Sequence, residues 1–328
     1  MGIIYDCEGN IMGYVSSYED KCFNAAITDE EYYSTWADSL GNPFGNSAST
    51  VTGVLNGVYT YNGISLDTSL VNKLELKDNE TLKEEDRENV DMRVLGLTVD
   101  YMTRLALAKD NRNEIIFHTA IDGLHKYCDI YYKRDNLARE RMMNRLSDYM
   151  RNIKDVEAFS VECAYNLARF DVCHRNMPMN FDPSAVMLPL DVIRNMKVMI
   201  NRTIKFIDTI GPVIGCGVGL SSNGKFDVDY AEVDYITDSC LIDLKVLSSK
   251  KLEFKHILQL LAYYILGKET YRKEFKHINK IMVFNPRYNT AHILKLSDVS
   301  EELIQSVKDN ILNYKKANTK KIKEGQEK

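Results

Sequence analysis

The spacing of apolar residues separates a helical middle of the chain from a C-terminal half that is rich in strands. From residue 92 to residue 207, apolar side chains recur about every 3.6 residues, which is the period of an amphipathic helix. Roughly four helices are expected there, and Asp191 is the expected N-cap of the last one. The periodic stretches are 94–108, 134–150, 158–175 and 191–207.

After residue 207 the period changes to that of extended strands. The expected strands are 213–220, 228–236, 240–247, 278–286 and 292–296. An apolar helix is expected over 254–266, ended by Gly267. The spacing of Asp298 and Glu301 predicts a capping box that starts a last helix, which runs to about Tyr314. The order strand, strand, strand, helix, strand, strand, helix predicts an α/β core rather than a helical bundle.

The two ends of the chain have compositions of their own. Residues 1–65 are rich in Tyr, Gly, Ser and Asn without a helical period, so short strands and loops are expected. The acidic run 73–91 is typical of a solvated helix face or a linker. The tail 315–328 holds six Lys and two Glu, and is either a solubilising tail or an electrostatic arm for nucleic acid. The expected segments are 1–91, 92–207, 208–314 and 315–328.

Composition and charge exclude several classes of protein. The chain is 45% hydrophobic and 27% charged, which is typical of a globular protein, and its net charge of −5 excludes a uniformly basic nucleic-acid binder. The N-terminus lacks the pattern of a signal peptide, and the longest uncharged apolar run, about 210–220, is too short to span a membrane. The seven cysteines are widely spaced without a C-x-x-C motif. We therefore expect buried thiols in a cytoplasmic protein that has no membrane partner.

One pair of predicted strands carries opposed charges. If Asp238 and Ser239 form a two-residue loop, Asp234 lies opposite Asp243, with Cβ atoms about 4.5–5.5 Å apart. Lys245 is two positions beyond Asp243 on the same strand, so the two side chains share a face. The sequence therefore places two carboxylates and one ammonium group together.

Like charges that face each other across a strand pair are unfavourable. The ordinary alternative is a solvent-exposed hairpin edge. However, Asp243 and Lys245 lie in the mostly apolar run 241–247, and charged residues are rarely buried in such a strand unless they are paired or functional. A divalent cation removes the conflict, because carboxylate oxygens are ligands that Mg²⁺ and Mn²⁺ prefer. A lysine beside an attacking water can orient it and stabilise the hydroxide that forms.

With two residues of the following helix, this pattern resembles the PD-(D/E)-x-K nuclease superfamily. The helix carries Gln259 and Tyr263, which are similar to the Q-x-x-x-Y motif of the RecB-type branch. Because the two are four positions apart, they lie on one helix face. The resemblance covers about residues 210–297. It implies a restriction-endonuclease-like mixed sheet in the C-terminal half, with a large helical insertion and an irregular N-terminal region before it.

The resemblance also implies a role for each matching residue. Asp234, Asp243 and the Leu244 carbonyl would bind Mg²⁺ or Mn²⁺, and Lys245 would assist the attacking water. Gln259 and Tyr263 would orient the site and contact the substrate.

RecB-type nucleases usually carry a further metal ligand, often His, on an earlier helix after a Gly. Asp100, after Gly96, takes that place, and the helices over 110–207 then form the insertion. The competing candidate is Glu162, on the predicted helix 157–174. Some members hold an iron–sulfur cluster with three Cys near the C-terminus, but no Cys follows Cys240, so no cluster is expected.

Two functions are compatible with this sequence. The first is a Mg²⁺- or Mn²⁺-dependent deoxyribonuclease, which by resemblance acts on DNA in repair, recombination or defence against foreign DNA, including viral DNA. The alternative is an inactive nuclease-fold module that binds nucleic acid, or a protein partner through the N-terminal or helical region. Divalent-metal binding discriminates between the two.

Overall fold

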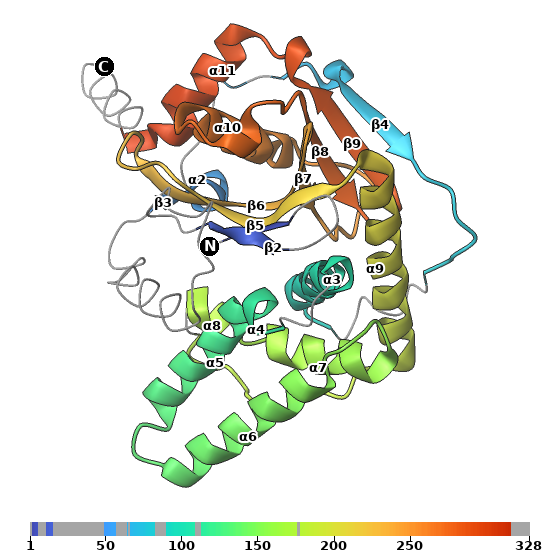
Figure 1. Cartoon of the computed structure of the whole chain (residues 1–328), viewed down its shortest axis with the longest axis vertical. Helices are drawn as coiled ribbons and strands as arrows, with labels where there is room; N and C mark the ends of the chain where they lie inside the picture. Colours follow the sequence, from blue (N-terminus) through green and yellow to red (C-terminus); the bar gives the residue numbers. More distant parts are fainter. Residues whose placement is uncertain are drawn as a thin grey trace, which may run out of the picture.

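The computed structural model of this chain describes residues 2–5, 11–15, 49–56, 64, 66–82, 90–108, 113–175 and 178–315. Within these ranges, nine strands form one mixed sheet in the order β2-β1-β5-β6-β7-β8-β9-β4, and β3 pairs with β6. The strands are β1 (Gly2–Tyr5), β2 (Ile11–Val15), β3 (Ser49–Thr50), β4 (Val71–Glu75), β5 (Val213–Ser221), β6 (Val228–Thr237), β7 (Cys240–Leu244), β8 (Lys280–Asn285) and β9 (Thr290–Lys295). Figure 1 shows helices on both faces of this sheet.

The centre of the sheet comes from the C-terminal half. β5, β6 and β7 are joined as antiparallel neighbours, whereas β7 and β8 are parallel. Parallel neighbours need a crossover connection, which α10 (Phe254–Glu269) supplies. α11 (Glu301–Val307) follows β9 and continues as a π-helix over Lys308–Leu312. The predicted order of elements is confirmed, and the protein has an α/β fold with a mixed sheet.

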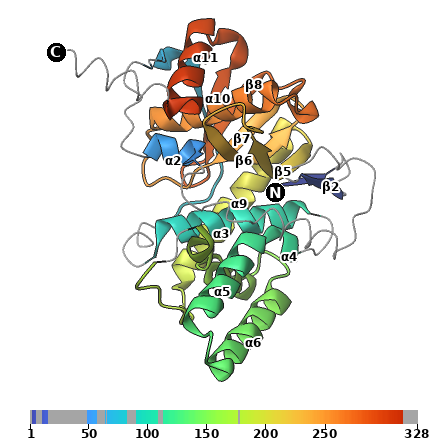
Figure 2. The same cartoon turned by 90° about the vertical axis from the view of Figure 1, so that its left-hand side faces the viewer.

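A hydrophobic core lies on each face of the sheet. The neighbouring residues Leu241 and Ile242 of β7 point into different cores, as alternation along a strand requires. In Figures 1 and 2, α10 and α11 cover one face together with α2, and the helices of the middle region cover the other. These helices are α2 (Val51–Asn56), α3 (Met92–Leu107), α4 (Asn113–Ile116), α5 (His118–Tyr131), α6 (Asn136–Asn152), α7 (Ala158–Ala168), α8 (Asp171–Arg175) and α9 (Leu190–Ile210); short 3-10 turns occupy Thr68–Leu70, Lys273–Phe275 and Leu296–Asp298.

The N-terminal region contributes strands to the same sheet. β1 pairs with β5, and β4 pairs with β9 along its whole length at the edge. The interpretation of 73–91 as a helix face or linker is therefore wrong for Lys73–Glu75, which lies in β4. Its charged side chains are exposed, and charges on an edge strand discourage pairing with other chains. The division of the chain into four segments stays a prediction.

The helical region differs from the prediction in two places. α5 was not predicted from the sequence. Its formation depends on close packing: a Cβ on Gly123 would lie 1.8 Å from the carbonyl oxygen of Phe170. The predicted helix over 158–175 is broken into α7 and α8 at residues 169–170.

Three predicted helix ends and one strand end are also corrected. α9 begins one residue before Asp191, with Pro189 at the N-cap position. α11 is capped by Ser300, whose hydroxyl accepts a bond from the Leu303 amide, rather than by Asp298. α10 runs past Gly267, because that glycine makes room for the Phe275 ring instead of ending the helix. β7 ends at residue 244, although the next amide still donates to the sheet.

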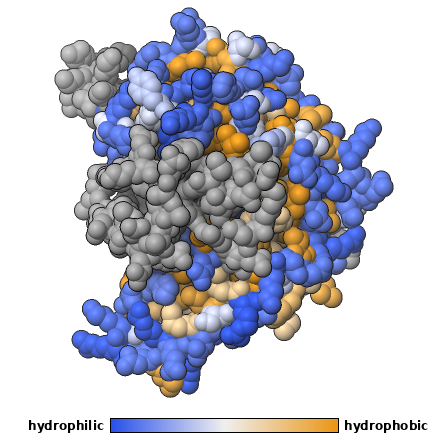
Figure 3. Space-filling view, in the orientation of Figure 1, coloured by the Kyte–Doolittle hydropathy of each residue, from blue (hydrophilic) through white to orange (hydrophobic). Residues whose placement is uncertain are grey.

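The described surface agrees with a folded globular chain. Hydrophilic side chains cover most of the described face in Figure 3, and apolar residues form smaller patches. Among the described residues, no helix combines the length and apolar character needed to cross a membrane. Five cysteines are buried thiols, as predicted: Cys128, Cys163, Cys173, Cys216 and Cys240. Cys7, Cys22 and the tail beyond Lys315 lie outside the described residues.

Candidate functional site

The β6–β7 hairpin forms with the predicted register. Tyr235 pairs with Ile242 and Ile236 with Leu241, so continuing the register by one residue brings Asp234 level with Asp243. The Asp234 carboxylate accepts a hydrogen bond from the Leu244 amide at 2.7 Å through Oδ2. Asp234 is therefore held against the C-terminal end of β7.

Asp243 is the buried centre of the site. Its residue is 1% exposed, and Lys245 Nζ lies 2.8 Å from Oδ1 and 2.7 Å from Oδ2. Burial raises the pKa of Asp243 to about 7, because the nearby Lys245 opposes this effect only in part and the Asp234 charge adds to it. For Lys245, the attraction of the two carboxylates outweighs burial and raises its pKa, so the ammonium stays charged. The predicted placement of Asp243 and Lys245 on one face is confirmed, and the two side chains form an ion pair.

α10 supplies the next two predicted residues. Gln259 Nε2 donates to Tyr263 Oη at 2.8 Å and lies 3.3 Å from Asp243 Oδ1. The amide group must face the carboxylate with its NH₂ side, because its oxygen would be repelled. Tyr263 Oη also lies 3.2 Å from Thr52 Oγ1 of α2. A chain of hydrogen bonds thus runs from the Asp243 carboxylate to a helix on the far side of the site.

A buried arginine organises the other side of the site. Arg104 Nη2 lies 2.5 Å from Asp100 Oδ2 and 3.8 Å from Asp234 Oδ1, and its Nη1 lies 3.4 Å from Glu232 Oε1. The other Asp100 oxygen accepts a bond from Tyr235 Oη at 2.7 Å. Burial raises the pKa of Asp100 to about 6 despite Arg104. One guanidinium therefore forms ion pairs with three carboxylates, one from α3 and two from β6.

Gly217 of β5 makes room for this guanidinium. A Cβ at this position would lie 2.3 Å from Arg104 Nη1, which is far inside van der Waals contact. The residue also has φ +59°, in the left-handed region that favours glycine. Arg104 can lie across the sheet only because the chain has no side chain here.

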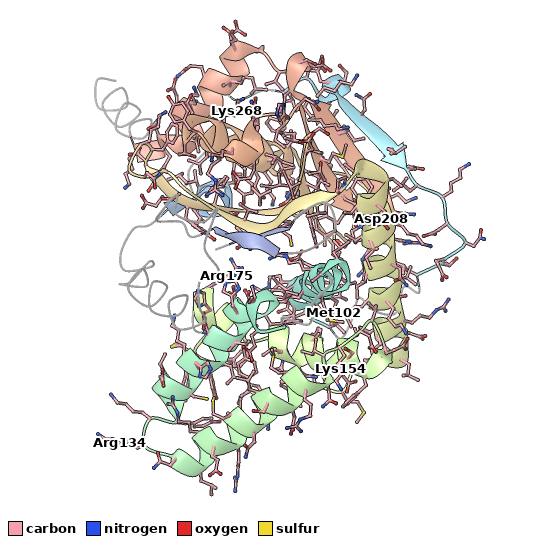
Figure 4. All side chains as sticks on the ribbon, viewed as in Figure 1. Met102, Arg134, Lys154, Arg175, Asp208 and Lys268 are labelled. Atoms are coloured by element: carbon pink, nitrogen blue, oxygen red, sulfur yellow. The ribbon has the colours of Figure 1, made fainter. Side chains whose placement is uncertain are left out.

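The charged side chains described above line one cavity of about 390 Å³, together with Gln259, Tyr263 and Thr52. Four carboxylates and three cations with permanent charge line it, so with every carboxylate ionised the wall carries one excess negative charge. The third cation, Arg175, lies between α8 and the sheet in Figure 4 and is paired with Asp171. His118 also lines the cavity, but burial lowers its pKa to about 4, so it is neutral near pH 7.

The structure separates the two candidates for the further ligand. Asp100 lies in the cavity, but both of its oxygens are engaged, by Tyr235 and Arg104. Glu162 lies elsewhere: it lines a different cavity on α7 and accepts a bond from the Leu188 amide at 3.1 Å. The proposal of Glu162 as a ligand of this site is therefore wrong, because α7 does not reach the cavity.

Several residues of the site were missed by sequence reasoning. Arg104 is four positions after Asp100 on one helix face, and Glu232 is two positions before Asp234 on one strand. Both spacings were visible signals. Thr52 and Gly217 had no such signal, because their roles depend on the packing of distant segments.

Two carboxylates of the site are placed to bind a divalent cation, but a third protein side chain that could complete a metal site is not found among the described residues. Asp234 and Asp243 meet in one cavity, and Mg²⁺ is often held by only one or two carboxylates with waters and phosphates. Among the residues that the structure describes, no group of three His, Cys, Asp or Glu side chains is arranged to hold a metal. No protein-family model, curated protein or solved structure matches this chain.

Proposed function

We propose that this α/β protein is a metal-dependent nuclease that hydrolyses DNA phosphodiester bonds. The observation that carries the proposal is the meeting of Asp234, Asp243, Lys245 and Gln259 at one buried point of a cavity. These residues come from two strands and the following helix, in the order of the PD-(D/E)-x-K pattern with a RecB-type Q-x-x-x-Y motif. The restriction-endonuclease-like fold, DNA rather than RNA, and a role in repair, recombination or defence rest on that resemblance.

A Mg²⁺ or Mn²⁺ ion would be held by Asp234, Asp243 and the Leu244 carbonyl. When bound, such an ion polarises a phosphoryl oxygen and lowers the pKa of a coordinated water. With all four carboxylates ionised, the cavity wall has one excess negative charge, and a cation is the group that would neutralise it.

The protein's own residues would then position the reactants. Lys245 keeps its proton beside two carboxylates, so it cannot remove a proton and would instead orient the attacking water and stabilise its developing charge. Gln259 donates a hydrogen bond to Asp243, and Tyr263 accepts one from the same amide group. Arg175 and Arg104 face the same cavity and can contact phosphate oxygens.

The test is cleavage of labelled linear and circular DNA, single- and double-stranded, with Mg²⁺, Mn²⁺ or EDTA. We expect cutting that depends on metal and falls at least about a hundredfold in Asp243→Ala and Lys245→Ala, because each removes a group that stabilises charge in the reaction. Asp208→Asn, an exposed change on α9 (Figure 4), is the matched control and should cut like the wild type. Cutting that survives in both site variants would refute this assignment. No cutting with any metal would favour the inactive binding module.

A further inference from the structure

Among the described cations that line the cavity, Arg104 forms ion pairs with the largest number of residues. Its guanidinium contacts three carboxylates from two elements: Asp100 on α3, and Glu232 and Asp234 on β6. The residue is 8% exposed, and its Nε has no hydrogen-bond partner among the residues that the structure describes. A planar guanidinium remains charged at any ordinary pH, so it is a permanent cation at this place.

Asp234 lies between this cation and the lysine side of the site. Its Oδ1 faces Arg104 at 3.8 Å, while its Oδ2 accepts the bond from the Leu244 amide next to Asp243. In nucleases with two metal ions, carboxylates bridge ions about 3.5–4 Å apart, which stabilise the attacking and leaving oxygens. Here a guanidinium stands on one side of the bridging carboxylate.

We propose that Arg104 takes the place of a second metal ion and limits this site to one divalent cation. The inference rests on the proposed metal-dependent function. Arg104 neutralises Asp100, Glu232 and the Oδ1 side of Asp234 with a permanent positive charge. The divalent ion would neutralise Asp243 and the Oδ2 side of Asp234. Asp100 is then the anchor of the arginine and not a metal ligand. Gly217 is needed for this arrangement, because a side chain at that position would displace the Arg104 guanidinium.

The number of Mn²⁺ ions bound by the full chain tests the inference without any measurement of activity. Free Mn²⁺ is counted by electron paramagnetic resonance during a titration at pH 8. The wild type should bind one ion, and Arg104→Met should bind two, because three carboxylates lose their shared cation. Arg104→Lys should again bind one, since it restores the charge. Arg175→Met removes a different cation from the cavity wall and should leave the count at one.

A second variant makes the inference independent of how well Arg104→Met folds. Glu232→Gln should change the affinity of the wild-type Mn²⁺ site by less than about threefold, because Glu232 faces the arginine and acts on the ion only at a distance. Asp243→Asn should weaken the affinity at least about a hundredfold, because it removes a ligand.

The outcomes separate the inference from the proposed function. Two ions in the wild type, one ion in a folded Arg104→Met protein, or a tenfold loss of affinity in Glu232→Gln would each overturn the role of Arg104. No Mn²⁺ binding by the wild type would instead overturn the metal-dependent function itself.

Discussion

The cavity has two halves that balance their buried charges in different ways. In the lysine half, one ammonium group lies against Asp243, and a neutral amide completes the contacts. In the arginine half, one guanidinium contacts Asp100, Glu232 and Asp234. Burial raises the pKa of Asp243 to about 7, whereas the charges of Arg104 and Arg175 overcome the same effect at Glu232 and lower its pKa to about 2.

This difference shows which half has an unsatisfied charge. Glu232 is ionised throughout the physiological range, because two arginines act on it. Asp243 is only partly ionised near pH 7, although its only described ion-pair partner is a charged lysine. The pKa of Asp100 in the arginine half is also raised, to about 6, but both of its oxygens are engaged, by Arg104 and Tyr235. A divalent cation would therefore gain more at Asp243 in the lysine half.

The largest effect is expected from removing a charge in the arginine half. Asp100→Asn leaves Arg104 paired only with Glu232 and Asp234, which lie farther from it than Asp100 does. The free energy of unfolding, measured in urea at pH 7 without metal, should therefore fall by about 3 kcal/mol, as expected when a buried ion pair loses one partner. Asp243→Asn is the matched variant in the lysine half. It should cost less than about 1 kcal/mol, because its carboxylate is already partly protonated and Lys245 keeps contact with solvent. Equal costs would contradict the difference between the halves.

The next effect is a dependence of metal binding on pH. Asp243 must lose its proton to bind a cation, and its pKa is about 7, raised from 3.8 mainly by burial. The affinity for Mn²⁺ should thus rise about a hundredfold from pH 5 to pH 8 and level off above that. Without metal, the raised pKa means that stability is lost as the pH rises from about 4 through about 7, so Mn²⁺ should raise the melting temperature more at pH 8 than at pH 5.

Calorimetric titrations at half-unit pH intervals measure this profile. Asp243→Asn is the control, and the binding that remains should vary little over the same range. A wild-type affinity that is flat between pH 5 and pH 8 would show that Asp243 does not control the site.

The lysine half could be predicted from the sequence, whereas Asp100 was predicted only by resemblance and its partners Arg104 and Glu232 were missed. The register of a two-residue hairpin and the alternation of a strand fix Asp234, Asp243 and Lys245 from local spacing alone. Gln259 and Tyr263 follow on a helix that lies next in the chain. The spacing of Arg104 from Asp100 and of Glu232 from Asp234 was visible in the sequence. The meeting of the two pairs depends on how α3 packs against the sheet, which local spacing does not fix.

The fold shows the same limit. The order of strands and helices after residue 207 follows from hydrophobic period, whereas α5 and the edge strand β4 depend on partners distant in sequence. Gly123 and Gly217 each permit a close contact with such a partner, and Gly267 permits one with the nearby Phe275. A glycine read from sequence alone signals a turn or a helix end as readily as a contact, which is why Gly267 was misread.

A smaller effect is expected from filling the space above Gly217. Gly217→Ala should destabilise the protein by about 2 kcal/mol, because a Cβ is strained at φ +59° and would displace the Arg104 guanidinium. Gly224→Ala is the matched control: it has φ +76° but no atom within 4 Å of its Cβ, so only the backbone cost of about 1 kcal/mol remains. Equal losses in the two variants would mean that Arg104 moves aside without cost, and the arginine half would then be less rigid than its contacts indicate.

The smallest effect concerns the hydrogen bonds that hold the lysine half. Tyr263→Phe removes the acceptor of the Gln259 amide and the contact with Thr52, at a cost of about 1 kcal/mol in urea denaturation. Gln259 keeps its contact with Asp243, so metal binding should persist while cleavage falls about tenfold through loss of orientation. Tyr264→Phe, at the next position of α10, is the control. It should change the free energy of unfolding by less than about 0.5 kcal/mol and leave cleavage unchanged. If Tyr263→Phe instead abolished Mn²⁺ binding, the tyrosine would be holding the Asp243 carboxylate in place, and the lysine half would depend on α2 as strongly as the arginine half depends on Gly217.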